Sequence, residues 1–147
     1  MKLDKLEELL NSSWSKETCS PSLRDSWNEN NPSLGQCAIT ALIVNDCFGG
    51  KIMRCMTSSG SHYYNLIDDK IVDLTVSQFL GEIPLYEKGE ERTREYLLGN
   101  EDTKNRYIKL LYNLKQTIER RNNIFYECEL RHKNNINLII KMYSKKD

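Results

Sequence analysis

The sequence predicts an α+β domain in which a buried helix packs on a small antiparallel sheet, with further helices toward the C-terminus. Three observations lead to this prediction. Residues 37–44 are apolar on nearly every side, which is typical of a buried helix. Three segments with two-residue alternation follow, and the turns between them are too short for parallel crossovers. Beyond residue 90 the apolar spacing returns to that of helices.

Length and composition suit one ordinary globular domain. The chain has 147 residues, 21 basic and 21 acidic, with 39% hydrophobic and 29% charged residues. The longest apolar stretch, 38–44, is too short to cross a bilayer, and acidic residues interrupt the N-terminal region where a signal peptide would be apolar. We therefore expect a cytoplasmic protein without a membrane partner. Zero net charge argues against general nucleic-acid binding.

The first elements in order are a helix and a long irregular segment. Leucines at helical spacing predict a helix over Leu3–Ser13. Residues 14–35 show no period and are rich in Ser, Asn and Pro. A loop of this length inside a compact domain needs anchors, and Trp14 and Trp27 are the expected ones.

The buried helix has start and stop signals. Ser33 and Gln36 have the spacing of a capping box, so the helix is expected to continue to about Cys47 and to end at Gly49 and Gly50. Three strands should follow, separated by turns at 58–60 and 68–69. Their expected ranges are Lys51–Met56, Ser61–Ile67 and Ile71–Thr75.

The C-terminal third is expected to hold two helices and an extension. One helix should cover Glu90–Leu98, and Asn100 should open another that continues to about Arg121, which closes a domain over 1–121. Residues 122–147 form either a hairpin or a continuation of the helix. Their β-branched and aromatic residues favour a hairpin of Ile124–Leu130 and Ile136–Tyr143. Because an isolated hairpin is marginal in water, it would dock on the core or on a second chain, which makes a homodimer.

Cysteine and histidine counts bear on metal and redox chemistry. The five cysteines are odd in number and show no CxxC spacing, and the chain has two histidines. A structural zinc site needs four clustered ligands, so we expect neither a metal nor another cofactor. In a cytoplasmic protein these cysteines should be reduced.

Three residues together indicate nucleophilic chemistry. Cys37 lies at the start of the buried helix, where unpaired N–H groups and the helix dipole favour a thiolate. If residues 68–69 form the turn, Tyr64 pairs with Asp73, and His62 and Asp73 become diagonal neighbours on one face. Asp73 could then orient the imidazole. Taken singly, Cys37 could be a core residue, His62 a structural histidine and Asp73 a cap for the turn that follows.

A cysteine at a helix start, followed by His and Asp on adjoining strands, is the arrangement of papain-like and transglutaminase-like cores. Gln36 could contribute to an oxyanion site, as an upstream glutamine does in papain-like enzymes. It directly precedes the cysteine, however, so the capping role is favoured for it. Asn65 is an alternative orienter, but strand alternation points it away from His62.

The sequence also resembles the YunG-like family, a group of small uncharacterised bacterial proteins. The resemblance covers about residues 1–120 and rests on 35–50 (GQCAITALIVNDCFGG), 61–65 (SHYYN) and 72–79 (VDLTVSQF), with further matches around 14–18, at Trp27 and over 100–107. It implies a shared fold unit and shared positions that include Gln36, Cys37, His62 and Asp73. It implies no substrate.

These observations favour a cysteine hydrolase or acyltransferase that acts on an amide or a thioester, whose substrate the sequence does not name. The alternative is a non-catalytic binding module on the same scaffold, with a vestigial triad. A third class, binding of nucleic acid or of a protein partner, would require the basic residues Arg120, Arg121, Arg131 and Lys133 to form one patch.

Overall fold

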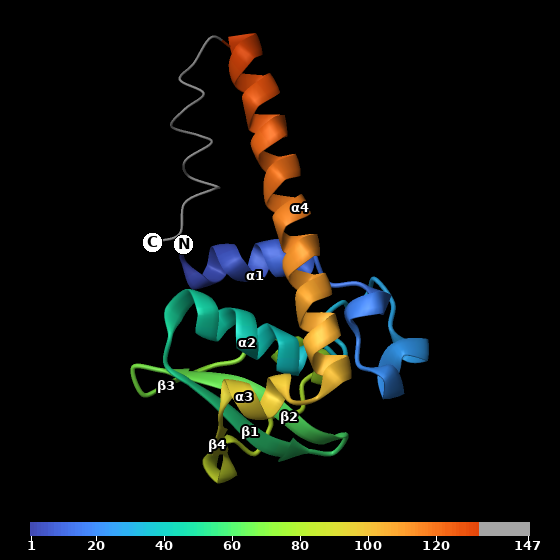
Figure 1. Cartoon of the computed structure of the whole chain (residues 1–147), viewed down its shortest axis with the longest axis vertical. Helices are drawn as coiled ribbons and strands as arrows, with labels where there is room; N and C mark the ends of the chain where they lie inside the picture. The colour runs from blue at the N-terminus through green and yellow to red at the C-terminus, as the bar shows by residue number, and fades with distance from the viewer. Residues whose placement is uncertain (133–147) are drawn as a thin grey trace. The chain divides into compact units, whose positions relative to one another are not determined.

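A computed structural model describes residues 1–132 of the chain, and its described part is α+β (Figure 1). The helices are α1 (Leu3–Asn11), α2 (Cys37–Phe48), α3 (Arg94–Leu98) and α4 (Glu101–His132). The strands are β1 (Lys51–Thr57), β2 (Gly60–Ile67), β3 (Lys70–Val72) and β4 (Glu90–Arg92), and the short 3-10 helices are η1 (Lys16–Thr18), η2 (Pro21–Ser26), η3 (Val76–Phe79) and η4 (Tyr86–Lys88).

The chain divides into two compact units. One consists of residues 1–13 together with the chain from Tyr112 on, and the other is Trp14–Leu111. In the first unit, the Ser13 and Thr117 hydroxyls lie 2.8 Å apart, and Arg121 donates to the carboxylate of Glu8. The second unit holds the sheet, α2 and every candidate site residue that the sequence indicates.

The sheet of the second unit has four antiparallel strands in the order β3-β2-β1-β4. Helix α2 lies along one face of it (Figure 1). Residues 39–44 of α2 are all buried, as their apolar composition predicts, and Leu42 packs with Ile52 of β1 and Leu97 of α3. The expected buried helix on an antiparallel sheet is therefore confirmed. The tryptophan anchors are confirmed too, since the Trp14 Nε1 donates to Thr40 Oγ1 at 3.0 Å and the Trp27 Nε1 to Pro32 O at 2.9 Å.

A two-residue turn joins β2 to β3. Asp68 and Asp69 have φ values of 50° and 60°, the left-handed values that a type I′ hairpin turn requires. Aspartate tolerates this conformation better than most residues do. The turn pairs Ile67 with Lys70 and Asn65 with Val72. Continued by one residue, this register sets Tyr64 opposite Asp73, as expected from the sequence.

Residues 90–98 differ from the sequence prediction. Glu90–Arg92, expected as the start of a helix, is strand β4, which pairs with β1 along its otherwise open edge. Charged side chains suit such an edge strand. The helix begins only at Arg94 because Thr93 caps it, accepting a hydrogen bond from the Tyr96 N–H at 3.1 Å.

Two further strand predictions were wrong. The backbone of Ile124–Leu130 belongs to α4, because two asparagines cost a helix only about 1 kcal/mol and cannot end one that is already formed. The other expected strand of that hairpin, Ile136–Tyr143, lies outside the described residues. Strand β3 ends at Val72 rather than Thr75, because the Asp73 side chain accepts a hydrogen bond from the Thr75 N–H and bends the chain.

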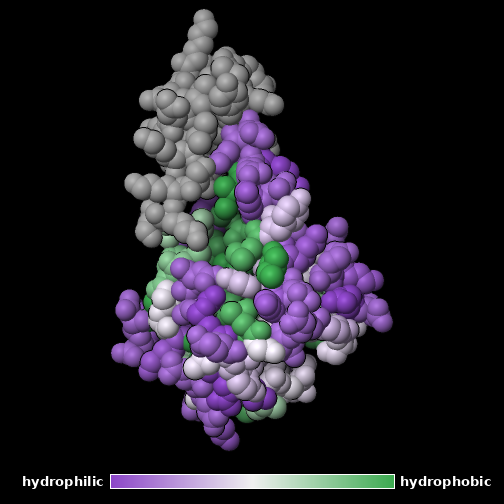
Figure 2. Space-filling model, in the orientation of Figure 1, coloured by the Kyte–Doolittle hydropathy of each residue, from purple (hydrophilic) through white to green (hydrophobic). Residues whose placement is uncertain are grey.

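The surface drawn in Figure 2 is mostly hydrophilic over the described residues. Within residues 1–132, none of the helices combines the length and the apolar character needed to cross a bilayer.

Candidate active site

Cys37 is the first residue of α2 and is half-buried. The chain reaches it through Gly35, whose φ is +70° and where a Cβ would lie 2.5 Å from the Cys19 Sγ. Glycine is therefore required for this approach. At the start of a helix, the first N–H groups have no partner within the helix.

The expected capping box before Cys37 was wrong. Gln36 is the N-cap residue, but its side chain makes no capping hydrogen bond. Its Nε2 instead donates to Ser15 O at 3.0 Å, while the Ser33 hydroxyl lies 2.9 Å from that of Ser77. Gln36 is fully buried and does not line the pocket around Cys37. Both side chains tie neighbouring loops together because positive φ at Gly35 breaks the backbone geometry that a capping box needs.

His62 and Asp73 meet as the register predicts. The His62 Nε2 lies 2.6 Å from the Asp73 Oδ2, and the two side chains are 1% and 4% exposed. A charge-assisted hydrogen bond in such a dry environment is strong and fixes the imidazole orientation. Because Nε2 is hydrogen-bonded to the Asp73 carboxylate, Nδ1 is the imidazole nitrogen available for proton transfer.

Asp73 is itself held from three directions. Its Oδ2 also accepts a hydrogen bond from the Tyr86 hydroxyl at 2.6 Å, and its Oδ1 accepts from the Thr75 N–H at 3.2 Å and from the Thr75 hydroxyl at 3.3 Å. Asp73 therefore caps the turn that follows and orients His62 at the same time. The two roles that the sequence left as alternatives occupy different oxygens of one carboxylate.

The environment of His62 favours its protonated form. Burial lowers the pKa of His62, but the hydrogen bond to Asp73 and the interaction with Cys37 outweigh it and raise the pKa to about 9. Nδ1 is buried and has no hydrogen-bond partner among the described residues. The Phe79 ring packs edge-on against the imidazole at 4.7 Å between centroids and shields it from water.

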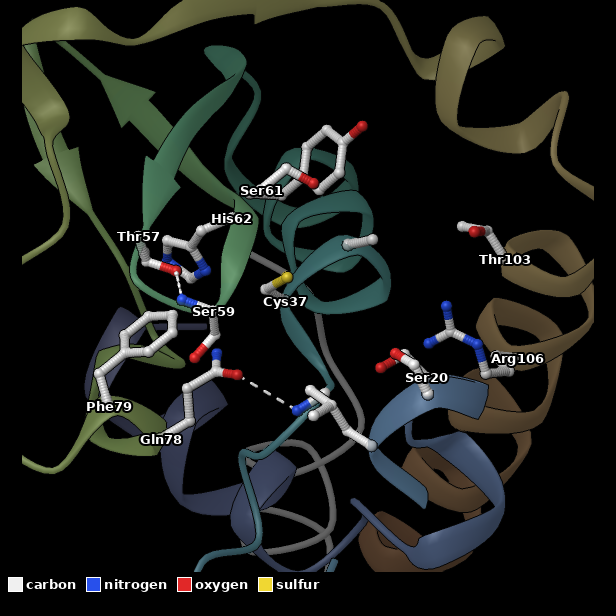
Figure 3. Close-up of a pocket in the computed structure, with 15 residues that line it drawn as sticks. Ser20, Cys37, Thr57, Ser59, Ser61, His62, Gln78, Phe79, Thr103 and Arg106 are labelled. Atoms are coloured by element: carbon white, nitrogen blue, oxygen red, sulfur yellow. Dashed lines mark hydrogen bonds between the residues drawn. The ribbon is translucent and has the colours of Figure 1, made fainter. Parts of the chain in front are cut away.

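These groups surround a pocket of about 290 Å³. In Figure 3, Cys37 lies between His62 and Phe79 on one side and Thr103 and Arg106 on the other. The lining residues are Ser20, Ser22, Leu23, Gly35, Cys37, Ala38, Thr57, Ser59, Ser61, His62, Tyr63, Gln78, Phe79, Thr103 and Arg106. None of them is acidic. A second pocket of about 370 Å³ shares Ala38, Tyr63 and Thr103 with the first, so the two adjoin.

In the structure, Cys37, His62 and Asp73 lie close together, whereas the Asn65 side chain lies away from them. The Asn65 Nδ2 donates to Ala41 O at 3.0 Å on the α2 side of the sheet, so Asn65 is not an orienter of His62. Sequence reasoning gave no site role to four residues that the structure places here: Gln78, Phe79, Tyr86 and Arg106. Only the segment 72–79 signalled two of them, since it contains Asp73 and is one of the segments on which the family resemblance rests.

Two other described cysteines differ from Cys37 in their surroundings. Cys19 and Cys55 are 0% and 3% exposed, and burial raises the pKa of both thiols, that of Cys55 to about 11. Buried thiols of this kind are poor nucleophiles. Over residues 1–132, no three side chains of His, Cys, Asp or Glu cluster in a way that could hold a metal ion.

Comparison with known proteins identifies the family. A family model described as YunG protein matches residues 2–119. The chain is 33% identical over 100 residues to a protein of Bacillus subtilis (strain 168) described as uncharacterized protein YunG, an alignment that covers 68% of this chain and 83% of that protein. No solved structure matches the chain. The family match spans the whole pocket, from Ser20 to Arg106, and on this evidence the chain belongs to the YunG family.

Proposed function

We propose that this protein is a cysteine hydrolase or acyltransferase that acts on an amide or a thioester through Cys37, His62 and Asp73. The observation that carries the proposal is that the two nitrogens of the His62 ring have different surroundings. Nε2 is locked to Asp73 at 2.6 Å, whereas the buried Nδ1 has no hydrogen-bond partner in the described chain and the ring faces Cys37 across the pocket (Figure 3). A structural histidine would have both nitrogens satisfied.

The charge state of His62 suits a thiolate nucleophile. With a pKa of about 9, His62 carries a proton at neutral pH. In the proposed resting site, the proton of Cys37 resides on His62 Nδ1, and the thiolate lies beside the imidazolium at the start of α2. Asp73 stabilises that imidazolium and prevents the ring from turning.

The proposed reaction has two steps, acylation of Cys37 and its deacylation. The Cys37 thiolate attacks the substrate carbonyl, and the His62 imidazolium gives its proton to the departing amine or thiol, which leaves an acyl thioester on Cys37. Neutral His62 next takes a proton from water or from an acceptor nucleophile, which attacks the thioester and releases Cys37 as thiolate. The imidazolium and thiolate pair is thereby restored.

Donors for the developing oxyanion are available at the start of α2. The first N–H groups of the helix, beginning at Cys37, are the primary candidates. Gln78 is the side-chain candidate: it lines the pocket, one N–H of its Nε2 donates to Thr75 O at 3.0 Å, and its Oε1 accepts from the Gly35 N–H at 3.2 Å. Its second amide N–H is left for the substrate. Gln36, a possible oxyanion donor from the sequence although a capping role was favoured for it, is buried and does not line the pocket.

In this proposal the domain has a papain-like core, with a nucleophile at the start of a buried helix facing a base and its orienter on the sheet. The likeness rests on the order Cys37, His62, Asp73 along the chain and on the use of Nε2 for the orienting carboxylate. The pocket of about 290 Å³ would hold the acyl group, and the adjoining pocket of about 370 Å³ the leaving group or acceptor.

Trapping the acyl intermediate tests the proposal. Incubation with phenyl thioacetate, followed by intact-mass and peptide mapping, should show one acetyl group on Cys37 in the wild-type protein. Cys37→Ser should not retain a thioester, and His62→Ala should acetylate more slowly. Cys47→Ser is the matched control, because Cys47 is half-buried like Cys37 but does not line the pocket. Acetylation spread over several cysteines, or absent from Cys37, would contradict the proposal.

A binding module is the second candidate, and the hydroxyl-rich pocket favours it, because such a lining binds polar ligands whether or not Cys37 reacts. A module would bind ligands equally well with Cys37→Ser and would form no acyl intermediate. The trapping experiment therefore separates the two candidates.

A further inference from the structure

Arg106 is the charged residue that faces Cys37 from the far side of the pocket. It belongs to α4 and is 7% exposed. In Figure 3 its guanidinium lies beside Ser20 and Thr103, opposite His62 and Phe79. Burying an arginine this deeply is costly unless its charge is compensated or used.

Within the described residues, two of the three guanidinium nitrogens of Arg106 donate hydrogen bonds to protein acceptors. The Arg106 Nε donates to Asp102 Oδ2 at 2.7 Å, and the Nη1 donates to Thr18 O at 3.1 Å. Among the described residues, Nη2 donates to no protein acceptor. The two fixed contacts hold the plane of the guanidinium, so Nη2 is preorganised for a ligand.

The charges around Arg106 favour an anion at that end of the pocket. Arg106 is positive and no acidic side chain lines the pocket, whereas the charge of protonated His62 is already met by Asp73 and by the proposed Cys37 thiolate, so Arg106 is the cation that would attract a ligand anion. Asp102 offsets part of the charge from outside, where its side chain is 43% exposed. The neutral hydroxyls of Ser20 and Thr103 add hydrogen bonds but no charge. The single open nitrogen Nη2 with two hydroxyls matches a single carboxylate better than a dianionic phosphate.

We propose that Arg106 makes this pocket selective for substrates that carry a carboxylate on the acyl side of the bond attacked by Cys37. The proposal rests on the proposed function and names its substrate class: an amide or thioester of an acyl group with a terminal carboxylate. Arg106, with Ser20 and Thr103, binds the carboxylate at one end, and the reactive carbonyl then lies at Cys37. Arg106 is a specificity and positioning residue and takes no part in proton transfer.

The test measures binding in the full-length Cys37→Ser protein, which cannot turn ligands over. The probes are N-methylmalonamate, N-methylsuccinamate and N-methylglutaramate, in which the carboxylate lies on the acyl side of the amide, each compared with its primary amide by isothermal titration calorimetry. These pairs have the same shape and differ in charge, while their length varies in single-carbon steps. At least one acid should bind about tenfold or more tightly than its amide, as expected for a hydrogen bond to a charged group in a dry pocket.

Variants then test whether Arg106 causes the preference for the acid over the amide. Adding Arg106→Gln should abolish the preference for the acid and leave the affinity for the amide within about twofold. Lys104→Gln is the matched control, since it removes an exposed cation from the same helix and should preserve the preference. Asp102→Asn keeps Arg106 and removes its neighbouring negative charge, so it should preserve or increase the preference even if the Arg106 variant fails to fold.

The inference is overturned if acids and amides bind alike at all three lengths, if the preference survives Arg106→Gln, or if Asp102→Asn abolishes it. None of these measurements requires a reactive thiol. Failure to trap an acyl group on Cys37 would therefore count against the proposed function alone, and failure of the acid preference against this inference alone.

Discussion

The pair of His62 and Asp73 should make folding stability depend on pH in a predictable window. The pKa of His62 is raised from 6.5 in the unfolded chain to about 9 in the folded protein. A raised pKa means that the folded state binds the proton more tightly. The stabilisation is thus fully present below about pH 6.5 and is lost as the pH rises through about 9.

The size of this effect follows from the same two values. One pKa unit corresponds to about 1.4 kcal/mol, so loss of the proton on His62 should by itself lower the free energy of unfolding by up to about 3 kcal/mol between about pH 6 and pH 9. Solvent screening should not reduce this much, because the His62 side chain is 1% exposed. The raised pKa values of Cys55 and Tyr86 act above about pH 9. In the proposed resting pair Cys37 has given up its own proton, which offsets the effect of the proton on His62, so the slope is measured in Cys37→Ser, where residue 37 carries no thiol.

Urea unfolding of the full-length Cys37→Ser protein under reducing conditions, at steps of half a pH unit from about 6 to 9, measures the slope. Asp73→Asn removes the charged partner and should flatten it, as should His62→Gln. Asp69→Asn is the matched control, because it removes an exposed carboxylate at a turn position that asparagine accepts. A Cys37→Ser protein that also carries Asp73→Asn and loses stability with pH as steeply as Cys37→Ser alone would refute the reasoning.

Four further predictions concern the same residues and the C-terminus. Iodoacetamide should alkylate Cys37 faster than any other cysteine, as read by peptide mapping, and faster labelling elsewhere at every pH would contradict the nucleophile assignment. His62→Ala should slow that alkylation about tenfold at pH 6–7, because the imidazolium that stabilises the thiolate is lost, while circular dichroism stays unchanged. Tyr86→Phe should lower the free energy of unfolding by about 1.5–3 kcal/mol through the lost hydrogen bond to Asp73, measured in urea against the wild-type protein. Deleting 122–147 should lower the melting temperature if this segment packs on the core, or the mass seen by light scattering if it packs on a second copy, and a truncated protein unchanged in both would exclude docking of the segment.

The core of the fold could be predicted from the sequence because its signals are local. The apolar run of α2 and the alternation in β1 and β2 each reflect a periodic burial pattern, and the turn at Asp68 and Asp69 determines the register. That register was enough to bring His62 to Asp73. Strand β4 could not be predicted, because its pairing depends on the open edge of β1 and not on its own residues.

The remainder of the site depends on long-range contacts that no local pattern encodes. Tyr86 reaches Asp73 from a short 3-10 helix beyond the sheet, and Arg106 reaches the pocket from α4. The Gln36 prediction failed for a related reason: its spacing from Ser33 fits a cap, but the conformation of Gly35 sends the side chain to Ser15. The spacing of residues along the sequence shows which local hydrogen bonds are possible, whereas tertiary packing determines which of them form.

The turn at Asp68 and Asp69 makes the site sensitive to chain length at a distance. A strand presents alternate residues to opposite faces, so one inserted or deleted residue between β2 and β3 would move Asp73 to the other face, away from His62. Replacement of either turn residue by Asn or Gly keeps the left-handed backbone and leaves the alignment intact. Evolution can therefore vary the chemistry of this turn freely but not its length, and an engineer who needs an insertion point in this protein should look elsewhere.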